Sequence, residues 1–328
     1  MPFAPQRIGS WLFCVLSGLG LCACAVAQPL SFGLFGDTPY SRWEREQLPP
    51  MMSAMGSEGL SFAVHAGDIK KGSGVCSDEV FRDILGVFQS APLPLIYVPG
   101  DNDWTDCHRR SNGGHDPLER LARLRELFFA GDETLGQRRF ELERQSGDPE
   151  HARYRENVRW EMGGVLFVGL NVPGSHNNFH GPRGRGGPTA EYLERSAANR
   201  AWLAQAFARA RGKQLAGVLI IVQGNPGFEA ASAGHAKPGY AEFIDQLRAE
   251  TQAYAGQVVL VHGDTHYFQV NQPLLNIQGT GVLHNFTRVE VYGYPFMGWV
   301  RGTVDLASPT IFSFTPSRWN PAPPAGSP

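Results

Sequence analysis

Four apolar runs in this 328-residue chain end in the dipeptide Gly-Asp, and this recurrence restricts the possible folds more than any other feature. The runs are LSFGLFGD, LSFAVHAGD, PLIYVPGD and VVLVHGD, which place Asp37, Asp68, Asp101 and Asp264 directly after a glycine. Such runs are typical of buried strands, and polar residues at strand carboxyl ends line ligand sites in α/β sheets. A single Gly-Asp is common in turns. Four of them, the last followed by x-His, predict one site assembled from distant parts of the chain.

Strand and helix patterns alternate along the first part of the chain. We expect strands over 31–35, 60–66 and 92–98, and helices over 41–55 and 77–89 with Ser41 and Ser77 as N-caps. This β-α-β-α-β order favours an α/β sheet with helices packed on it.

The later pattern continues this alternation and then changes. Asp116 is the expected N-cap of a helix over 116–129, and 135–155 is expected to run over the surface as an insertion. The remaining expected elements are a hairpin (157–162 and 165–170), helices (189–210 and 240–254) and strands (217–222 and 258–262). After residue 266, short β-like runs predict a mostly antiparallel sheet, and the Pro-rich residues 316–328 predict a disordered tail.

Residues 1–27 have the features of a signal peptide. Arg7 precedes an apolar run over 8–21, and the small-x-small residues 25–27 predict cleavage before Gln28. A membrane anchor is the alternative reading, and Cys22 and Cys24 raise that of a lipoprotein. No other run is long enough to cross a bilayer. We therefore expect an exported protein, periplasmic or secreted, with no transmembrane span after signal removal.

Cysteine usage agrees with export. Removing residues 1–27 leaves Cys76 and Cys107, which we expect to form a disulfide that joins the loops after Asp68 and Asp101. Two unrelated buried thiols are the alternative. The formal net charge of −2 shows no basic excess, so nothing in the composition predicts a nucleic-acid partner.

The residues of the predicted site are chemically suited to cations. Clustered carboxylates repel one another and raise each other's pKa values. Two divalent metal ions would remove that penalty, activate water and stabilise a phosphoryl transition state. The chain offers Asp37, Asp68, Asp101, Asp264 and His266 for this purpose.

At these motifs the chain resembles the calcineurin-like metallophosphoesterase superfamily. That family is marked by Gly-Asp-x-His, Gly-Asp, Gly-Asn-His-Asp/Glu, a His near a Pro, and Gly-His-x-His. The matching segments here are 36–39, 67–68, 100–103, 223–226 and 263–266. The resemblance implies a four-layer αββα sandwich of two mixed β-sheets flanked by helices, over residues 28–315, with a two-metal site at the strand ends.

The chain departs from the family pattern at several ligand positions. Pro39 replaces a ligating His, with Tyr40 as a possible substitute, as in purple acid phosphatases. Asn102 stands at the catalytic His position. The fourth segment has no His, so an amide of Gln223 or Asn225 is the expected ligand there.

The resemblance then implies two sets of ligands. One metal would take Asp37, Asp68 and His266, and the other Asp68, Asp101, Asp264 and an amide, with Asn225 as our first choice. Oxygen ligands favour Mg, Mn, Ca or Fe over Zn. A single bound metal is the alternative.

The implied activity is hydrolysis of a small-molecule phosphomonoester or phosphodiester by attack of a metal-bound hydroxide. Asn102 would hydrogen-bond the phosphate, Lys70 would pair with it, and His108 would protonate the leaving group. For each of Lys70 and His108, an ordinary surface residue is the alternative.

Several other residues are open to two readings. The loop 171–188 carries His176, His180, Arg183 and Arg185, which either line the substrate pocket or lie in solvent. Trp104 either packs on the sheet or stacks on a substrate ring, and His262 is expected in the core or behind the ligands. At the level of function, the alternatives are a non-catalytic module that keeps the fold and binds metal or phosphate, and an envelope protein with accidental Gly-Asp turns.

Overall fold

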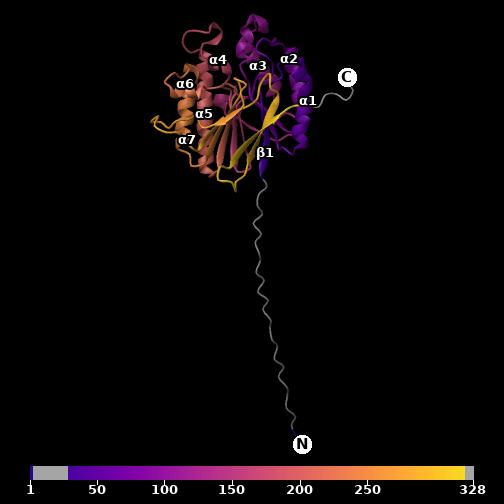
Figure 1. Cartoon of the computed structure of the whole chain (residues 1–328), viewed down its shortest axis with the longest axis vertical. Helices are drawn as coiled ribbons and strands as arrows, with labels where there is room; N and C mark the ends of the chain where they lie inside the picture. Colours follow the sequence, from indigo (N-terminus) through magenta and orange to yellow (C-terminus); the bar gives the residue numbers. More distant parts are fainter. Residues whose placement is uncertain (3–28, 322–328) are drawn as a thin grey trace.

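In the computed structural model, which describes residues 1–2 and 29–321, two mixed β-sheets stack face to face between two helical layers (Figure 1). This arrangement confirms the predicted αββα sandwich. The predicted signal peptide, its two first residues apart, and the last seven residues of the predicted tail lie outside the described part of the chain. In that part, no helix has the length and apolar character needed to span a membrane.

The first sheet has the strand order β12-β11-β1-β2-β3, in which the central strands are parallel and β11 and β12 are antiparallel. Its strands are β1 (Leu30–Phe35), β2 (Ala63–His65), β3 (Leu95–Tyr97), β11 (Gly298–Val304) and β12 (Phe312–Arg318). Its helices are α1 (Arg42–Ser57), α2 (Asp78–Gln89) and α3 (Pro117–Phe128). The three predicted N-caps are confirmed, because Ser41, Ser77 and Asp116 each accept from a backbone N–H in the first turn.

The second sheet has the order β4-β5-β6-β7-β8-β10-β9. Its strands are β4 (Glu143–Arg144), β5 (Val158–Met162), β6 (Val165–Gly169), β7 (Gly217–Ile221), β8 (Gln257–His262), β9 (Gln269–Asn271) and β10 (Phe286–Glu290). Its helices are α4 (Gly174–Asn177), α5 (Ala190–Gly212), α6 (Phe228–Ser232) and α7 (Pro238–Gln252). Short 3₁₀ helices are η1 (Thr105–His108), η2 (Arg110–Asn112), η3 (Gln145–Gly147), η4 (Pro149–His151) and η5 (Gly181–Arg183).

Three of the expectations about the fold need correction. β10 runs parallel to β8, so the region after residue 266 is not simply antiparallel. The predicted surface insertion over 135–155 contains β4, and Gln145 within it is fully buried. β12 continues to Arg318, so residues 316–318 pair in the sheet and do not belong to a disordered tail.

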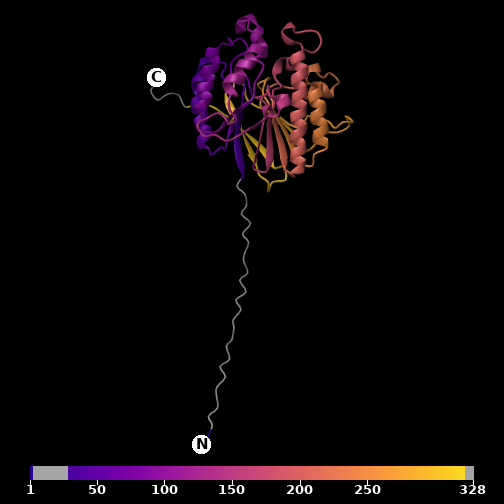
Figure 2. The same cartoon turned by 180° about the vertical axis from the view of Figure 1, so that it is seen from behind.

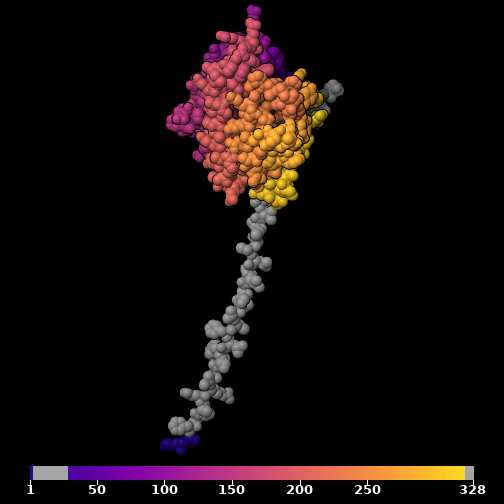
Figure 3. Space-filling view, turned by 90° about the vertical axis from the view of Figure 1, so that its left-hand side faces the viewer, coloured from indigo at the N-terminus to yellow at the C-terminus, as the bar shows by residue number. Residues whose placement is uncertain are grey.

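A separate hydrophobic cluster fills each of the three gaps between the layers. Between the sheets, the rings of Phe32, Phe62 and Phe167 lie with centroids 5.2–5.3 Å apart. The outer gaps are filled from α1–α3 on one side and from α5 and α7 on the other. Figure 3 shows the second of these outer faces, where the orange segment of α7 lies beside the salmon segment of α5.

The fold brings several strand ends to one edge. β1, β2 and β3 are parallel, as are β6, β7, β8 and β10. Their carboxyl ends lie at the upper end of the sandwich, beside α4 in Figure 1 and again in the reverse view of Figure 2. The loops that carry all four Gly-Asp motifs follow strands in this set.

Candidate metal centre

The four aspartates of the Gly-Asp motifs lie together at this edge. The backbone N–H of Asp264 donates to both carboxylate oxygens of Asp37, at 3.2 and 3.1 Å. The N–H of Asn102 donates to Asp68 at 3.0 Å and to Asp101 at 3.1 Å. The loop after β1 is therefore linked to the loop after β8, and the loop after β2 to the loop after β3, although the members of each pair are far apart or separated in sequence.

His266 also reaches this cluster. Its Nε2 lies 3.7 Å from Oδ1 of Asp37, and its Nδ1 lies 2.8 Å from the carbonyl oxygen of Tyr294. Because a carbonyl can only accept, Nδ1 carries a proton, and Nε2 is the ring nitrogen nearer Asp37. Histidines that bind metals are oriented in this way by a backbone carbonyl or a carboxylate.

The backbone of these residues is unusual. Asp37, Asp68, Asp264 and His266 have φ values of 48°, 61°, 79° and 65°. Non-glycine residues in this left-handed region each cost on the order of 1–3 kcal/mol, and they concentrate at functional sites. Holding these side chains in their positions therefore costs conformational free energy.

The glycine of one motif makes room for the carboxylate of another. A Cβ on Gly100 would lie 2.1 Å from Oδ1 of Asp68, and one on Gly263 would lie 2.2 Å from Oδ2 of Asp37. Both distances are shorter than any non-bonded contact allows. Glycine is thus required by the close approach of the motifs to one another.

Burial and mutual repulsion control the charge of the cluster. Burial, followed by the charge of Asp264, raises the pKa of Asp37 well above its usual range. Burial and then Asp101 raise the pKa of Asp68 in the same way. The same two causes raise the pKa of Asp264 to about 7. A bound cation would offset this repulsion and favour the ionised carboxylates.

Asp103, to which the sequence motifs assign no role, joins two of the loops. Its Oδ2 accepts from the N–H of Gly100 at 2.7 Å, the N–H of Asp68 at 2.9 Å and the hydroxyl of Tyr97 at 2.7 Å. Its Oδ1 accepts from the N–H of Ile69 at 2.8 Å. The side chain is fully buried. Asp103 therefore fixes the loop after β2 against the loop after β3.

Tyr40 and Asn102 both support Asp68. The Tyr40 hydroxyl donates to Oδ2 of Asp68 at 2.8 Å. Asn102 Nδ2 donates to the same oxygen at 2.7 Å and to the Tyr40 oxygen at 2.9 Å. Both N–H groups of the Asn102 amide are thereby engaged, so a direct contact with phosphate would require one of these bonds to break.

The loop after β6 brings a serine into the cluster, which no sequence motif predicts. Oγ of Ser175 lies 2.7 Å from Oδ2 of Asp101 and 2.8 Å from Oδ1 of Asp106. Asp106 is itself buried, and burial followed by the charge of Asp101 raises its pKa to about 6. Ser175 thus connects the carboxylate cluster with a further acid on η1.

A buried arginine holds the loop that carries Ser175. Residues 175–178 all have positive φ, between 47° and 57°, so they form one left-handed turn. Arg195, fully buried on α5, donates to the side-chain oxygen of Asn177 at 2.6 Å and to its carbonyl at 2.9 Å. It also pairs with Glu191 at 2.6 Å, and Glu191 accepts from Asn178 at 2.7 Å. These bonds stabilise a turn that would otherwise be costly.

The amide of the fourth segment that reaches the cluster is that of Gln223. Its Oε1 accepts from the N–H of Asp101 at 3.3 Å and of Gly174 at 2.6 Å. Asn225, our expected ligand, instead accepts from the N–H of Gly227 at 3.0 Å and donates to Thr265 at 3.0 Å. The choice of Asn225 as a ligand is therefore not supported by its contacts.

The other predicted site residues fall into two groups. Lys70 is 5% exposed and lies near the carboxylates of Asp103 and Asp68, while burial lowers its pKa. Trp104 is fully buried beside Arg195, so it packs in the core and cannot stack on a substrate. His262 is also fully buried, as expected. His176, Arg183 and Arg185 are exposed, and His180 is partly so.

The predicted disulfide is present. Cys76 and Cys107 are bonded, with their Cα atoms 5.7 Å apart. The bond ties the start of α2 to η1, so it connects the loops that follow Asp68 and Asp101. His108 comes directly after this bond, and its Nδ1 lies 2.8 Å from the carbonyl of Thr105.

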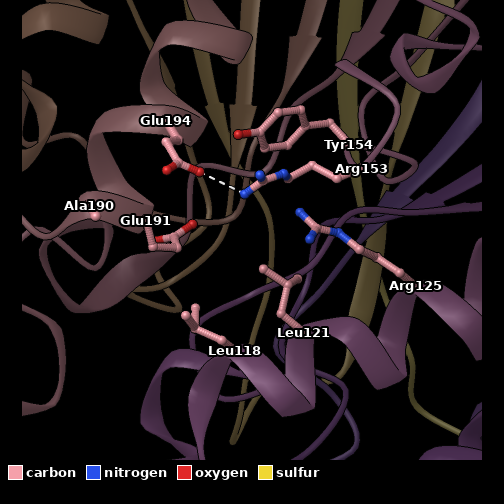
Figure 4. Close-up of a pocket in the computed structure, with 8 residues that line it drawn as sticks. All are labelled: Leu118, Leu121, Arg125, Arg153, Tyr154, Ala190, Glu191 and Glu194. Atoms are coloured by element: carbon pink, nitrogen blue, oxygen red, sulfur yellow. Dashed lines mark hydrogen bonds and ion pairs between the residues drawn. The ribbon is translucent and has the colours of Figure 1, made fainter. Parts of the chain in front are cut away.

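A cavity of about 280 Å³ opens between α3 and α5, apart from the carboxylates (Figure 4). Its wall includes Leu121 and Arg125 from α3 and Glu191 and Glu194 from α5, with Arg153 paired to Glu194 at 2.6 Å. Glu191 is also a partner of Arg195. One wall residue of the cavity, Glu191, therefore also takes part in the hydrogen bonds that hold the left-handed turn.

Comparison with known proteins places this fold. No family model and no curated protein matches the sequence. The solved structure of PhoD superposes with a TM-score of 0.54 over 88% of this chain and 68% of that chain, at 11% identity. The chain therefore shares the fold of PhoD, which agrees with the sandwich that the resemblance to the calcineurin-like metallophosphoesterases implies.

Two further solved structures show a lower similarity. A dimetal phosphatase from Danio rerio has a TM-score of 0.49 over 84% of this chain and 93% of that one, at 14% identity. A purple acid phosphatase from yellow lupin (Lupinus luteus) has a TM-score of 0.49 over 84% of this chain and 49% of that one, at 13% identity.

Of the two expected metal positions, the one at Asp37, Asp68 and His266 has its three side chains close to one another. Asp37 and Nε2 of His266 face each other, and Asp68 is close enough to interact electrostatically with Asp37. Among the described residues, no group of three or more His, Cys, Asp or Glu side chains is arranged to hold a metal ion. Asp68 is held by its bonds to Tyr40 and Asn102. Oδ2 accepts both of these bonds, whereas Oδ1 accepts only the N–H of Asn102, so Oδ1 keeps a lone pair for an ion.

The second expected position does not fit. It would need an amide oxygen from the fourth segment, but both amide oxygens are engaged by backbone N–H groups. Nε2 of Gln223 is buried and meets no acceptor within hydrogen-bond distance in the described structure. This position therefore presents a donor where a metal ligand would be required.

Proposed function

We propose that this chain is an exported, metal-dependent phosphoesterase that hydrolyses a small-molecule phosphomonoester or phosphodiester. The observation that carries the proposal is the pairing of Asp37 with His266, whose Nε2 lies 3.7 Å from Oδ1 of Asp37. This pair lies among buried carboxylates whose pKa values are raised by burial and by one another. The metallophosphoesterase fold agrees with this chemistry and does not by itself establish it.

The residues near the carboxylates have distinct proposed roles. A divalent cation held by Asp37, Asp68 and His266 would polarise the phosphoryl group and lower the pKa of water. Lys70 supplies a positive charge beside carboxylates that would otherwise repel an anionic ester. Tyr40 and Asn102 orient Asp68 through the hydrogen bonds described above. With mainly oxygen donors, the site should prefer Mn, Mg, Fe or Ca over Zn.

His108 is the proposed proton donor for the leaving group. Its Nδ1 lies 2.8 Å from the carbonyl of Thr105 and therefore carries a proton, which leaves Nε2 to exchange the second proton. The ring is partly exposed, and the neighbouring disulfide at Cys107 restrains its loop. Histidine is the side chain that most often acts as a general acid.

Export is supported by the disulfide between Cys76 and Cys107. Disulfides persist in oxidising compartments such as the periplasm or the extracellular space. The proposed signal peptide over residues 1–27 also indicates export.

The activity is tested with p-nitrophenyl phosphate and bis(p-nitrophenyl) phosphate. Protein stripped of metal is supplied with Mn, Fe, Mg, Ca or Zn in turn, and release of p-nitrophenol is followed. We expect turnover that depends on the metal and is lost in His266→Ala, because that change removes the imidazole facing Asp37. His284→Ala removes an exposed imidazole and serves as the matched control. Absence of turnover on both esters with every metal would contradict the proposal.

A non-catalytic module is the second candidate, and Asn102 is the observation that favours it. Asn102 cannot titrate, and both of its amide N–H groups are engaged by Asp68 and Tyr40. Such a module would bind metal or phosphate without hydrolysing either ester. Asp68→Ala separates the two candidates: in an enzyme it abolishes turnover, whereas in a binding module it changes only affinity or stability.

A further inference from the structure

We propose that the site holds a single divalent cation, at Asp37, Asp68 and His266, and that protein fills the place where the fold family would put a second one. The filling groups are the side-chain amide of Gln223 and the turn at Gly174 and Ser175. This inference rests on the proposed metal dependence and adds the number of ions to it.

The orientation of the Gln223 amide is fixed by its neighbours. Backbone N–H groups of Asp101 and Gly174 both point at one atom of the amide, at 3.3 and 2.6 Å. Only an oxygen can accept from them, so this atom is Oε1 and the other is the NH₂ group. The NH₂ group is buried and lies near Asp37. Gln223 thus presents hydrogen atoms to the site, and a metal ion cannot bind there.

The turn after β6 closes the second position from another side. A Cβ on Gly174 would lie 2.7 Å from Oδ2 of Asp101 and 2.9 Å from Oδ1 of Asp264, so its backbone is pressed against both carboxylates. Oγ of Ser175 occupies a hydrogen-bonding site on Oδ2 of Asp101. The N–H of Asn225 does the same on Oδ2 of Asp264, at 2.9 Å. The two carboxylates are thus paired with protein donors.

The turn is held in this place at a conformational cost. Ser175 and the three residues after it are left-handed and none of them is glycine. The buried side chain of Arg195 bonds to both the side chain and the carbonyl of Asn177. Strained backbone that is secured in this way is a feature of functional sites.

The inference is tested by counting manganese. The full chain is stripped of metal, equilibrated with Mn²⁺, and its bound metal is measured by elemental analysis and calorimetric titration. The electron paramagnetic resonance spectrum of the same sample gives an independent readout. We expect one Mn²⁺ per chain and the spectrum of an isolated ion, without exchange coupling between two.

Two substitutions identify the groups responsible. In His266→Ala we expect loss of the tight Mn²⁺ site. Gln223→Glu keeps Oε1 and replaces the NH₂ group by an oxygen of the same size, so we expect the count to rise from one toward two. His284→Ala is the control for the first, and circular dichroism checks that each variant is folded.

Each outcome decides something. A count of two in the wild-type chain overturns the inference and leaves the proposed phosphoesterase function standing. A count of zero overturns the metal dependence of the proposed function itself. A count of one in both the wild type and a folded Gln223→Glu variant overturns the role assigned to the amide.

Discussion

Asp103→Asn tests whether the loops of the site depend on one buried carboxylate. Asp103 accepts four hydrogen bonds: three at Oδ2, from Gly100, Asp68 and Tyr97, and one at Oδ1, from Ile69. An amide has one oxygen, which would stay with the three donors. Its NH₂ group would then face the N–H of Ile69, which would lose its acceptor in a buried place.

The magnitude follows from these bonds. A lost hydrogen bond to a charged acceptor costs about 1.5–3 kcal/mol, and the three that remain become neutral and so weaker. Removing one negative charge from beside Asp68 offsets part of this. We expect the free energy of unfolding to fall by about 2–4 kcal/mol.

Urea unfolding followed by tryptophan fluorescence measures this loss. The matched control is Asp245→Asn, since Asp245 has a side chain that is 71% exposed and pairs only at the surface with Arg248. Surface changes of this kind are expected to stay within about 0.5 kcal/mol. If Asp103→Asn loses no more than the control, Asp103 does not hold the loops together and the reasoning is refuted.

Three further predictions concern other parts of the chain. Replacing Cys76 and Cys107 together by Ala should lower the free energy of unfolding by about 3–4 kcal/mol, because the bond closes a loop with a sequence separation of 31; wild type unfolded with a reductant should match the variant. His176→Gly should raise the free energy of unfolding by about 1 kcal/mol, because φ there is 57° and the side chain is exposed, whereas His176→Ala should not. Burial lowers the pKa of His65 to about 4, below about 6.5 in the unfolded chain, so its stabilising contribution is present above pH 6.5 and is lost as the pH falls to 4. Relative to His65→Gln, which keeps a donor for the Thr38 carbonyl, the wild type should lose about 3 kcal/mol over this range in urea unfolding, and parallel pH profiles would contradict the assignment.

The parts of the fold that could be predicted are those controlled by local signals. Strands buried on both faces must be apolar throughout, and the caps Ser41, Ser77 and Asp116 are visible as single residues before helical patterns. The direction of β10 depends on how the chain crosses after β9, which no local pattern records. The polar side chain of Gln145 suggests a surface position. It is buried instead, and its amide is satisfied by donating to the carbonyl of Ala198 on α5.

The candidate site likewise contains some residues with a local sequence signal and others without one. The Gly-Asp motifs carry their own signal, because the tight approach of the loops requires glycine at positions such as 100 and 263. The roles of Asp103 and Arg195 were missed, since each depends on donors or acceptors contributed by other loops. The left-handed turn over residues 175–178 contains no glycine, so its conformation has little signal in the sequence.

Gln223 and the turn at Gly174 are best understood as one unit. The N–H groups of Asp101 and Gly174 both need the single oxygen that Gln223 supplies. An imidazole, the group that the fold family uses in this segment, has at most one accepting nitrogen, so Gln223→His would leave at least one of these buried N–H groups without an acceptor, at about 1–3 kcal/mol. A Cβ on Gly224 would lie 2.5 Å from the carbonyl of Pro173, so the loops after β6 and β7 are packed backbone to backbone. The absence of the family's histidine is therefore coupled to the approach of this turn, and a second metal position could be restored only by changing both.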